Sequence, residues 1–452
     1  MDQGLFRIRN ERYHSEQAKA NDERSPSERD YDRILYSSAF LRLAGVAQVA
    51  HTEDHCIVHN RLIHSLKVAR IGRGLAVRMC RDSEELLESV GGVDPSVVEA
   101  AALAHDLGHP PFGHIAEEEL NSLVHEQLRE FDAFEGNAQS FRVVTKLASR
   151  DVDYLGLNLT RATLDAIQKY PWHRGAEPRK RRKWGAYCTE SDIFEWTRQR
   201  HGGGEQRSAE AELMDWADDV AYATHDVEDY YRVGLLPLDR LLTDAQERER
   251  FLRGAFERWR AECRNVDGDE EVLRAAFDRV AKLVQAVAPA ELKEPYAGGR
   301  RQRAAIHTLI SMLINRFLNG IRLRKPDAQS RRCVACDSTC EQEILMLKEL
   351  IWHYVIRNAS LAALEYGQRK VIRDLFQIFR AEADSRRPGV FSHRYREQLE
   401  QVNSDYSGTE RTQQQVRVIV DIIAEMTEHR AYEIHKTLTG YSPASVLDYA
   451  GR

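Results

Sequence analysis

Four side chains of the metal-ligating types occur along this chain in an order that suits one metal centre. His64 lies in an apolar helical segment, the adjacent pair His105-Asp106 ends a second such segment, and Asp218 lies in a third. Imidazole nitrogens and carboxylate oxygens both bind divalent metal ions. A glycine and a proline pair stop the second helix just after His105-Asp106, in a loop where ligands stay accessible to substrate.

A His-Asp pair taken alone is more often a surface or capping pair than a metal site. The surroundings favour ligands here. His64 lies among apolar residues, and a buried histidine needs a hydrogen-bonding partner or a metal ion. Further on, Asp218, Tyr222 and Asp226 recur at fourfold spacing, so they line one helix face. Such a face can reach from a metal ion to a sugar.

At these residues the chain resembles the HD-domain deoxynucleoside triphosphate triphosphohydrolases, the dGTPase-like group. The resemblance extends to the segment 29–43 with Gln48-Val49, to Phe131–Gln139, and to 157–160 with Lys169-Tyr170-Pro171. There are two departures. Leu41 stands where the family often has arginine, and the stretch between Lys169 and Trp184 is unusually basic.

The resemblance implies hydrolysis of a dNTP, with dGTP expected first. Water attacks the α-phosphorus, and deoxynucleoside and inorganic triphosphate are released. The metal ligands would be His64, His105, Asp106 and Asp218. Two imidazoles make a site for Mg²⁺ alone less natural, so Mn²⁺, Mg²⁺ and Fe²⁺ all stay open as the cofactor.

A 5′-alkoxide leaves poorly unless it is protonated, so the reaction needs a general acid. His114 and Glu117 are the catalytic candidates, because a carboxylate three residues on favours the protonated imidazole. Glu117 can instead be a first-turn acid that complements the helix dipole. His109 either binds the α-phosphate or caps the loop.

A triphosphate also needs cations nearby. Arg61 lies one turn before His64 and can grip phosphate with two hydrogen bonds, and the resemblance assigns phosphate contacts to Lys169, Tyr170 and Lys183. A basic run such as residues 179–183 is more often a solvated surface. Its position beside aromatic residues keeps a single-stranded nucleic acid partner open.

The sugar and base contacts come from the resemblance. Gln48 and Asp226 match the 3′-hydroxyl contacts, and Tyr222 matches the residue packed against the sugar, although plain core packing is its alternative. We expect the base-reading residues near Glu365 and Tyr366. The sequence gives no code for one base over another.

The periodicity is helical almost throughout, which predicts an all-α fold. The resemblance implies that it is an HD-domain helical core with a C-terminal helical extension. We place the catalytic core at residues 1–240 and a C-terminal region, for base binding and oligomerisation, at 241–452. Helices are expected near 28–44, 60–81, 94–107, 114–130, 137–148, 160–168, 208–232, 242–262, 268–287, 301–318, 340–360, 361–382, 393–403 and 412–436. Glycine-rich breaks fall at 202–204 and 297–299.

Composition restricts the partners. The 452 residues carry a net charge of −6, which gives no global attraction to nucleic acid or acidic membranes. No apolar run approaches the roughly 18 residues of a membrane helix, so we expect a cytoplasmic protein without a membrane partner. The resemblance implies a closed homo-oligomer, expected to be a hexamer, although apolar runs such as 306–321 and 416–426 can equally be intrachain core.

Three of the seven cysteines, Cys333, Cys336 and Cys340, form a cluster that could hold zinc if His353 or another residue supplied a fourth ligand. The preferred interpretation is a thiol-rich loop entering a helix, because no second cysteine pair follows.

Two alternatives to the dNTP reaction stay open. One is another HD phosphohydrolase, such as a 5′-nucleotidase or phosphodiesterase, and the other is a nucleic-acid-binding regulator on the same fold.

Overall fold

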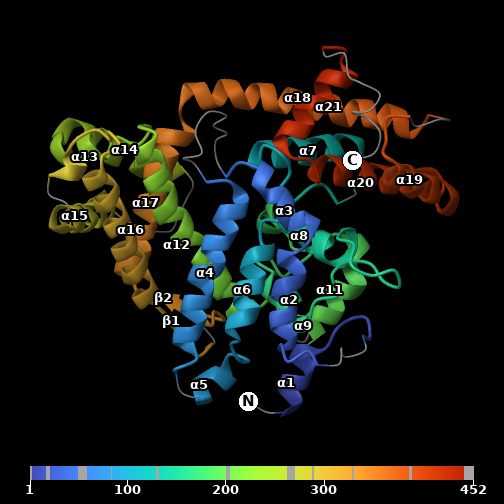
Figure 1. Cartoon of the computed structure of the whole chain (residues 1–452), viewed down its shortest axis with the longest axis horizontal. Coiled ribbons are helices and arrows are strands. Elements are labelled where there is room, and N and C mark those ends of the chain that lie inside the picture. The colour runs from blue at the N-terminus through green and yellow to red at the C-terminus, as the bar shows by residue number, and fades with distance from the viewer. Residues whose placement is uncertain are drawn as a thin grey trace.

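The computed structural model describes residues 3–16, 21–48, 59–82, 84–128, 132–199, 204–261, 270–287, 290–327, 330–385 and 389–441. In these ranges the regular structure is helical apart from one antiparallel pair of short strands, which confirms the predicted all-α class. Figure 1 shows the helices in their arrangement, with α18 crossing the top of the molecule.

The N-terminal part supplies the helices that surround the candidate ligands. These are α1 (Gln3–Asn10), α2 (Pro26–Leu35), α3 (Ser38–Arg42), η1 (Leu43–Gly45), α4 (Arg61–Met79), α5 (Glu84–Ser89), α6 (Pro95–Ala104), α7 (His114–Gln127), α8 (Gly136–Arg142), η2 (Val143–Leu147), α9 (Arg161–Ala166), α10 (Pro178–Arg182), η3 (Cys188–Glu190), α11 (Ser191–Arg198) and α12 (Ala209–Arg232).

The rest of the chain adds a second set of helices and the strand pair. These are α13 (Leu238–Thr243), α14 (Ala245–Ala261), α15 (Glu270–Val287), η5 (Glu291–Lys293), α16 (Arg300–Gly320), β1 (Ile321–Leu323), β2 (Val334–Cys336), α17 (Ser338–Ile351), η6 (Trp352–Ile356), α18 (Ala359–Ala383), α19 (His393–Asp405), α20 (Gly408–Ala424) and α21 (Glu428–Leu438).

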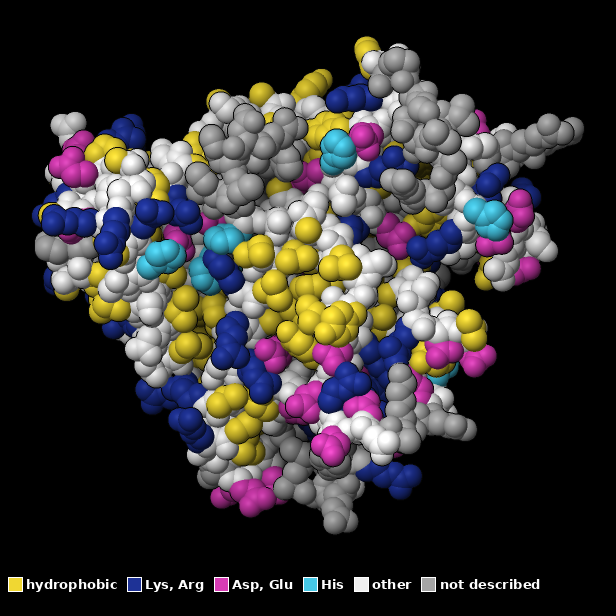
Figure 2. All heavy atoms as spheres, in the orientation of Figure 1, with side chains coloured by type: hydrophobic (Ala, Val, Ile, Leu, Met, Phe, Trp, Pro, Cys, Tyr) yellow, Lys and Arg dark blue, Asp and Glu magenta, His cyan; other side chains and the backbone are white. Residues whose placement is uncertain are grey.

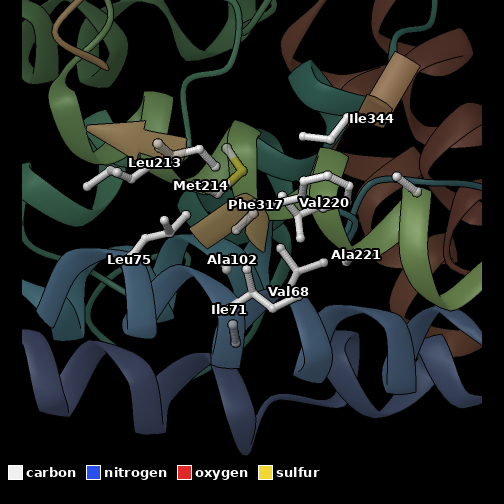
Figure 3. Packing of buried hydrophobic residues seen from close by; sticks show 14 of the residues in the cluster. Val68, Ile71, Leu75, Ala102, Leu213, Met214, Val220, Ala221, Phe317 and Ile344 are labelled. Carbon is white, nitrogen blue, oxygen red and sulfur yellow. The ribbon is translucent and has the colours of Figure 1, made fainter. Parts of the chain in front are cut away.

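Helices α4, α6 and α12 form the central bundle, and Figure 3 shows part of their shared core. Alanine and valine dominate α6, so its neighbours can approach closely. At Gly72 of α4 a Cβ atom would lie only 3.0 Å from Val98 of α6. Leu75 and Met214 are fully buried, and each such burial contributes about 1.5 to 3 kcal/mol. This close packing brings the segments that carry His64, His105 and Asp218 together.

A second buried cluster joins α7 to α18, α20 and α21. Phe376 and Ile419, which are fully buried, are among its members. Helix α7 begins at His114, so the C-terminal helices hold the element that carries the expected general acid. The first cluster continues past residue 240 to Phe251 and Ile344. The domain boundary near residue 240 stays a prediction.

Several expected helices are interrupted. The helix expected at 28–44 breaks at Ser37, whose side chain accepts from Phe40 N and caps α3. The helix expected at 412–436 is α20 and α21, separated by a turn where Thr427 caps the second helix. The ends of the helices expected at 137–148 and 340–360 are the π-helical segments η2 and η6. Five short helices, α1, α5, α10, α11 and α13, and the strands β1 and β2 were not predicted.

Of the clustered cysteines, Cys333 directly precedes β2, Cys336 is the last residue of β2 and Cys340 lies in the first turn of α17, and Cys333 and Cys340 are buried. Within the described ranges, the groups of three convergent ligand atoms contain none of these three thiols. His353 instead packs against the rings of Phe251 and Tyr354. The arrangement agrees with a thiol-bearing loop that enters a helix. Val49, Cys56, Phe131, Gly202, Gly203 and Cys263 lie outside the described residues.

The C-terminal apolar runs are intrachain core. Leu309, Leu313, Ile419 and Ile423 are at most 2% exposed within this one chain. Figure 2 shows hydrophobic side chains gathered instead over α3 and α4, where Leu41 at the end of α3 is 60% exposed. The homo-oligomer stays a prediction.

In the described ranges, every helix is too short or too polar to cross a membrane.

Candidate active site

A cavity of about 530 Å³ lies where α4, α6, α7, α12 and the start of α18 meet. It collects residues from sequence positions as distant as Ala47 and Glu428. Eleven of the fourteen predicted site residues line it: Gln48, Arg61, His105, Asp106, His109, His114, Lys169, Tyr170, Lys183, Asp218 and Tyr222. The other three, His64, Glu117 and Asp226, are buried and do not line the cavity.

Three of the predicted ligands converge at one side of the cavity. His64 Nε2 lies 3.1 Å from Asp218 Oδ1, and His105 Nε2 lies 3.8 Å from the same oxygen. The ligand atoms of these three residues all lie within 4.8 Å of one another. They come from α4, the end of α6, and α12, so the central bundle sets their spacing.

The residues present fit a divalent metal ion. His105 Nδ1 lies 2.6 Å from the carbonyl oxygen of Ala102, which places the proton on Nδ1 and leaves the Nε2 lone pair available. His105 Nε2 is buried and has no hydrogen-bond partner within the chain. A buried nitrogen acceptor left open beside a carboxylate and a second imidazole is the donor set expected of a metal site.

Asp106, the fourth predicted ligand, lies at the edge of this group. Its Oδ1 is 3.4 Å from His105 Nε2, while its Oδ2 accepts a 2.7 Å hydrogen bond from Arg61. Burial alone would raise the pKa of Asp106, but Arg61, His105 and His109 hold it well below its usual value. Asp106 therefore stays ionised. Its Oδ1 lies toward the group formed by His64, His105 and Asp218, and its Oδ2 lies toward Arg61.

A second group of ligand types faces the first. His114 Nδ1 lies 2.9 Å from Glu117 Oε2, and His109 completes the group with its ring 5.3 Å from that of His114. The structure thus brings the predicted catalytic pair together. The His114 side chain is 70% exposed toward the cavity, whereas Glu117 is buried. Burial and the neighbouring charge of Arg61 lower the pKa of His109 to about 4, so His109 is neutral near pH 7.

Lys183 holds Glu117 in place from the other side. Its Nζ lies 2.7 Å from Glu117 Oε1 and 3.0 Å from Glu135 Oε1. Burial would raise the pKa of Glu117, but the hydrogen bond from His114 and the charge of Lys183 hold it well below its usual value. Glu117 is therefore a carboxylate that can orient the His114 ring through this hydrogen bond.

Cations and carboxylates are interleaved along the rest of the cavity. Lys169 Nζ lies 2.7 Å from Asp215 and 3.2 Å from Asp218. Burial would lower the pKa of Lys169, but those two carboxylates raise it well above its usual value. Arg61, Lys169 and Lys183 are thus three charged donors held at the cavity, and together they can receive a polyanion.

The predicted sugar contacts divide into two sets. Gln48 and Tyr222 line the cavity, and Gln48 Oε1 is buried without a hydrogen-bond partner in the chain. Asp226 lies deeper, with its Oδ2 also unpartnered. Burial, then the charges of Asp229 and Asp218, raise the pKa of Asp226 well above its usual value. Direct contact between Asp226 and a sugar stays a prediction.

The opposite end of the cavity comes from the C-terminal helices. Of the two residues near which we expected base reading, Glu365 lines the cavity, whereas Tyr366 is 80% exposed and lies outside it. Sequence reasoning missed several lining residues there. They are Ile356, Leu361, Leu364, Gln368, Arg369 and Glu428. No local sequence pattern identifies these residues, because only tertiary packing brings them to the cavity that His105 and Asp218 also line.

The basic run is mostly engaged in surface ion pairs. Arg179 and Lys180 both pair with Glu177 and Glu205 on the outside of α10. Lys183, at the end of the run, turns toward the cavity. The basic run 179–183 therefore contributes one residue, Lys183, to the cavity, and its other residues form a helix on the protein surface.

Comparison with known proteins agrees with this architecture. Residues 61–223 match the HD domain family, and residues 334–437 match the phosphohydrolase-associated domain. The first match contains α4, α6 and the first part of α12, which carry His64, His105 and Asp218. The second contains α17 to most of α21, which close the cavity from the other side.

Relatives match over nearly the whole chain. A Streptomyces coelicolor protein is 35% identical, over 92% of this chain and 93% of the relative, and one from Corynebacterium efficiens is 33% identical, over 96% and 97%. A Shewanella baltica protein is 29% identical over 96% of each. All three are named deoxyguanosinetriphosphate triphosphohydrolase-like proteins. This chain belongs to their family, a group of hydrolases built on an HD domain.

Proposed function

We propose that this protein is a metal-dependent deoxynucleoside triphosphate triphosphohydrolase that prefers dGTP and releases deoxynucleoside and inorganic triphosphate. The observation that carries the proposal is the pairing of two groups across one cavity. His64, His105 and Asp218 form a ligand set at one side, and the His114–Glu117 pair faces it. The names of the relatives support the same reaction.

His64, His105, Asp106 and Asp218 would hold the divalent ion, which when bound supplies Lewis-acid chemistry toward a phosphoryl oxygen and water. Arg61, Lys169 and Lys183 would bind the triphosphate oxygens. Water attacks the α-phosphorus, and the bond to the 5′ oxygen breaks. Because His114 Nδ1 faces Glu117, its Nε2 is the atom that delivers a proton to the leaving 5′ oxygen.

The products test this reaction directly. The protein is incubated with each of the four dNTPs and with GTP, under Mn²⁺ and under Mg²⁺, and the products are resolved by ion-exchange chromatography. Inorganic triphosphate together with deoxynucleoside is the expected result. Monophosphate or single phosphate ions would instead assign the chain to another class of HD phosphohydrolase.

Replacing Tyr222 by alanine is expected to narrow the preference for dGTP over GTP. Tyr222 lies between Asp218 and Asp226 on α12 and lines the cavity, so its ring can exclude a 2′ hydroxyl. Discrimination by packing alone makes kcat/KM about a hundredfold higher for dGTP than for GTP, and steric exclusion by a rigid ring can make this ratio larger. The ratio of kcat/KM for the two nucleotides measures it.

Tyr366→Ala is the matched control, because Tyr366 is exposed and lies outside the cavity lining. The control should keep the wild-type ratio. Equal turnover of GTP and dGTP by the wild-type protein would overturn the assignment of deoxyribose specificity.

Glu365 is our candidate for guanine selection. Ile356, Leu361 and Leu364 supply apolar walls for a base, and Glu365 lies among them. A carboxylate offers two acceptors, which match the N1–H and the 2-amino group of guanine, whereas adenine presents an acceptor at N1. A site built to pair with substrate donors discriminates strongly against analogues that lack them.

Glu365→Gln should therefore reduce the preference for dGTP over dATP, by about 10-fold or more, because the amide replaces one acceptor by a donor. Competition between the two nucleotides in one reaction gives the ratio with its own internal control. An unchanged ratio would remove Glu365 from base selection.

A further inference from the structure

Helix α21 meets the active-site loops at its first residues. Glu428, the first residue of the helix, is 3% exposed and lines the cavity, although it lies beyond the HD match. Its Oε1 accepts a hydrogen bond from Ala47 N at 3.0 Å and another from Phe112 N at 3.3 Å. One carboxylate oxygen thus joins the segment that carries Gln48 to the loop that leads into His114.

The loop held by Glu428 has an unusual backbone. Phe112 has a φ of 68°, which a bulky side chain rarely adopts, and Gly113 follows with a φ of 57°. At Gly113 a Cβ atom would lie 3.0 Å from the Arg61 guanidinium. A backbone of this kind persists only where its surroundings determine it, and it tends to occur at functional sites.

Helix α21 and the turn before it supply those surroundings. The Tyr432 ring lies 5.0 Å from the Phe112 ring. Arg42 donates to Met426 O at 3.1 Å and, from its other nitrogen, to the carbonyl oxygens of Leu107 and His109 at 2.8 and 2.9 Å. Tyr432 of α21 thus packs on Phe112, while Arg42 at the end of α3 links the turn before α21, at Met426, to the start of the same loop at Leu107 and His109.

We propose that Glu428 is a positioning residue, which sets the distance between the His114–Glu117 pair and the metal side of the cavity. This inference rests on the proposed function. The His114–Glu117 contact lies inside α7, so it does not need Glu428. The placement of α7 relative to α6 does need Glu428. The connection between these two helices runs through Phe112 and Gly113, both of which have a positive φ. The phosphohydrolase-associated region would thereby complete an HD active site.

Glu428→Ala should lower kcat by about 10- to 100-fold, since small misplacement of a reacting group is costly. KM should change less, and bound metal should not change, because α4, the end of α6 and α12 carry His64, His105 and Asp218. Glu428→Gln should recover turnover to within about threefold, since the amide oxygen can accept both backbone hydrogen bonds. Glu433→Ala, on the same helix with a half-exposed side chain, should match the wild type.

A readout independent of activity accompanies the kinetics. Amide hydrogen exchange, followed by mass spectrometry, should speed up in peptides covering 42–48 and 107–116 in Glu428→Ala, and stay at the wild-type rate in Glu428→Gln and Glu433→Ala. Gly45→Ala is a second test that leaves the carboxylate intact. Its new Cβ would lie 2.7 Å from Thr427 Cγ2, so it should separate α21 from the same segment and also lower kcat.

Three results would overturn the inference. The first is unchanged exchange at 107–116 in Glu428→Ala. The second is an equal loss of kcat in the Gln and Ala variants, which would point to the charge rather than the two hydrogen bonds. The third is a loss of metal in Glu428→Ala. If the wild-type protein released no triphosphate from any dNTP, the proposed function would fail, while the exchange measurements would still decide whether Glu428 holds the loop.

Discussion

Replacing His105 by alanine is expected to remove the bound metal and stop hydrolysis. His105 Nε2 is buried without a partner in the chain, and its other nitrogen is committed to Ala102 O. Its loss leaves only one imidazole, that of His64, beside the carboxylates of Asp106 and Asp218. Metal ions contribute several kcal/mol to phosphoryl hydrolysis, so turnover should fall by roughly 10³-fold or more.

Metal content per chain, measured by inductively coupled plasma mass spectrometry after dialysis, checks this expectation together with dGTP turnover. Asp106→Ala should also lose metal, because Asp106 Oδ1 lies 3.4 Å from the same nitrogen. His125→Ala, an exposed position on α7, is the control and should keep both metal and activity. Stoichiometric metal in both ligand variants would show that the ion binds elsewhere.

The elements that set this centre could be predicted from the sequence because the core itself imposes their pattern. Helices α4, α6 and α12 carry buried residues along most of their length, so they appear in the sequence as long segments rich in apolar residues, and the predicted bounds agree with the structure to within a few residues. The same helices carry His64, His105 and Asp218. The order of ligand types along the chain was therefore enough to anticipate that three of them converge.

Local interruptions were harder to predict, since they depend on single caps. The Ser37 hydroxyl donates to Ile34 O at the end of α2 and accepts from Phe40 N at the start of α3, and the Thr427 hydroxyl accepts from Arg430 N at the start of α21. Both residue types are also tolerated inside helices, so a periodic apolar pattern runs across them unbroken. The predicted single helices at 28–44 and 412–436 were wrong for this reason.

Tertiary contacts at the cavity had no signal in the sequence at all. Glu428 and Phe112 are 316 residues apart, and nothing near Glu428 distinguishes it from the other glutamates of a charged helix. Arg61, Lys169 and Lys183 could be predicted from the sequence and the resemblance as phosphate contacts, but the carboxylates that pair with these cations in the structure could not. That Lys183 bridges Glu117 and Glu135 follows only from the packing of their three segments.

The remaining large effect concerns the proton donor. His114→Ala should leave the metal bound and reduce turnover by about 10²- to 10⁴-fold, the usual span for loss of a general acid. His114 is absent from the His64–His105–Asp218 group, and its side chain is 70% exposed toward the cavity, so its removal disturbs little packing. Turnover of dGTP and metal content per chain are measured on the same preparation, with His125→Ala as the control on α7.

The metal measurement matters because His109, His114 and Glu117 also form a group of convergent ligand atoms. If His114 bound a second ion, its loss would lower the number of ions per chain as well as turnover. If it acts as the acid, the metal content stays constant. Glu117→Gln then gives a smaller loss than His114→Ala, because the imidazole remains in place and loses only the carboxylate that orients it. A Glu117→Gln variant more impaired than His114→Ala would argue that Glu117, and not His114, is the group that reacts.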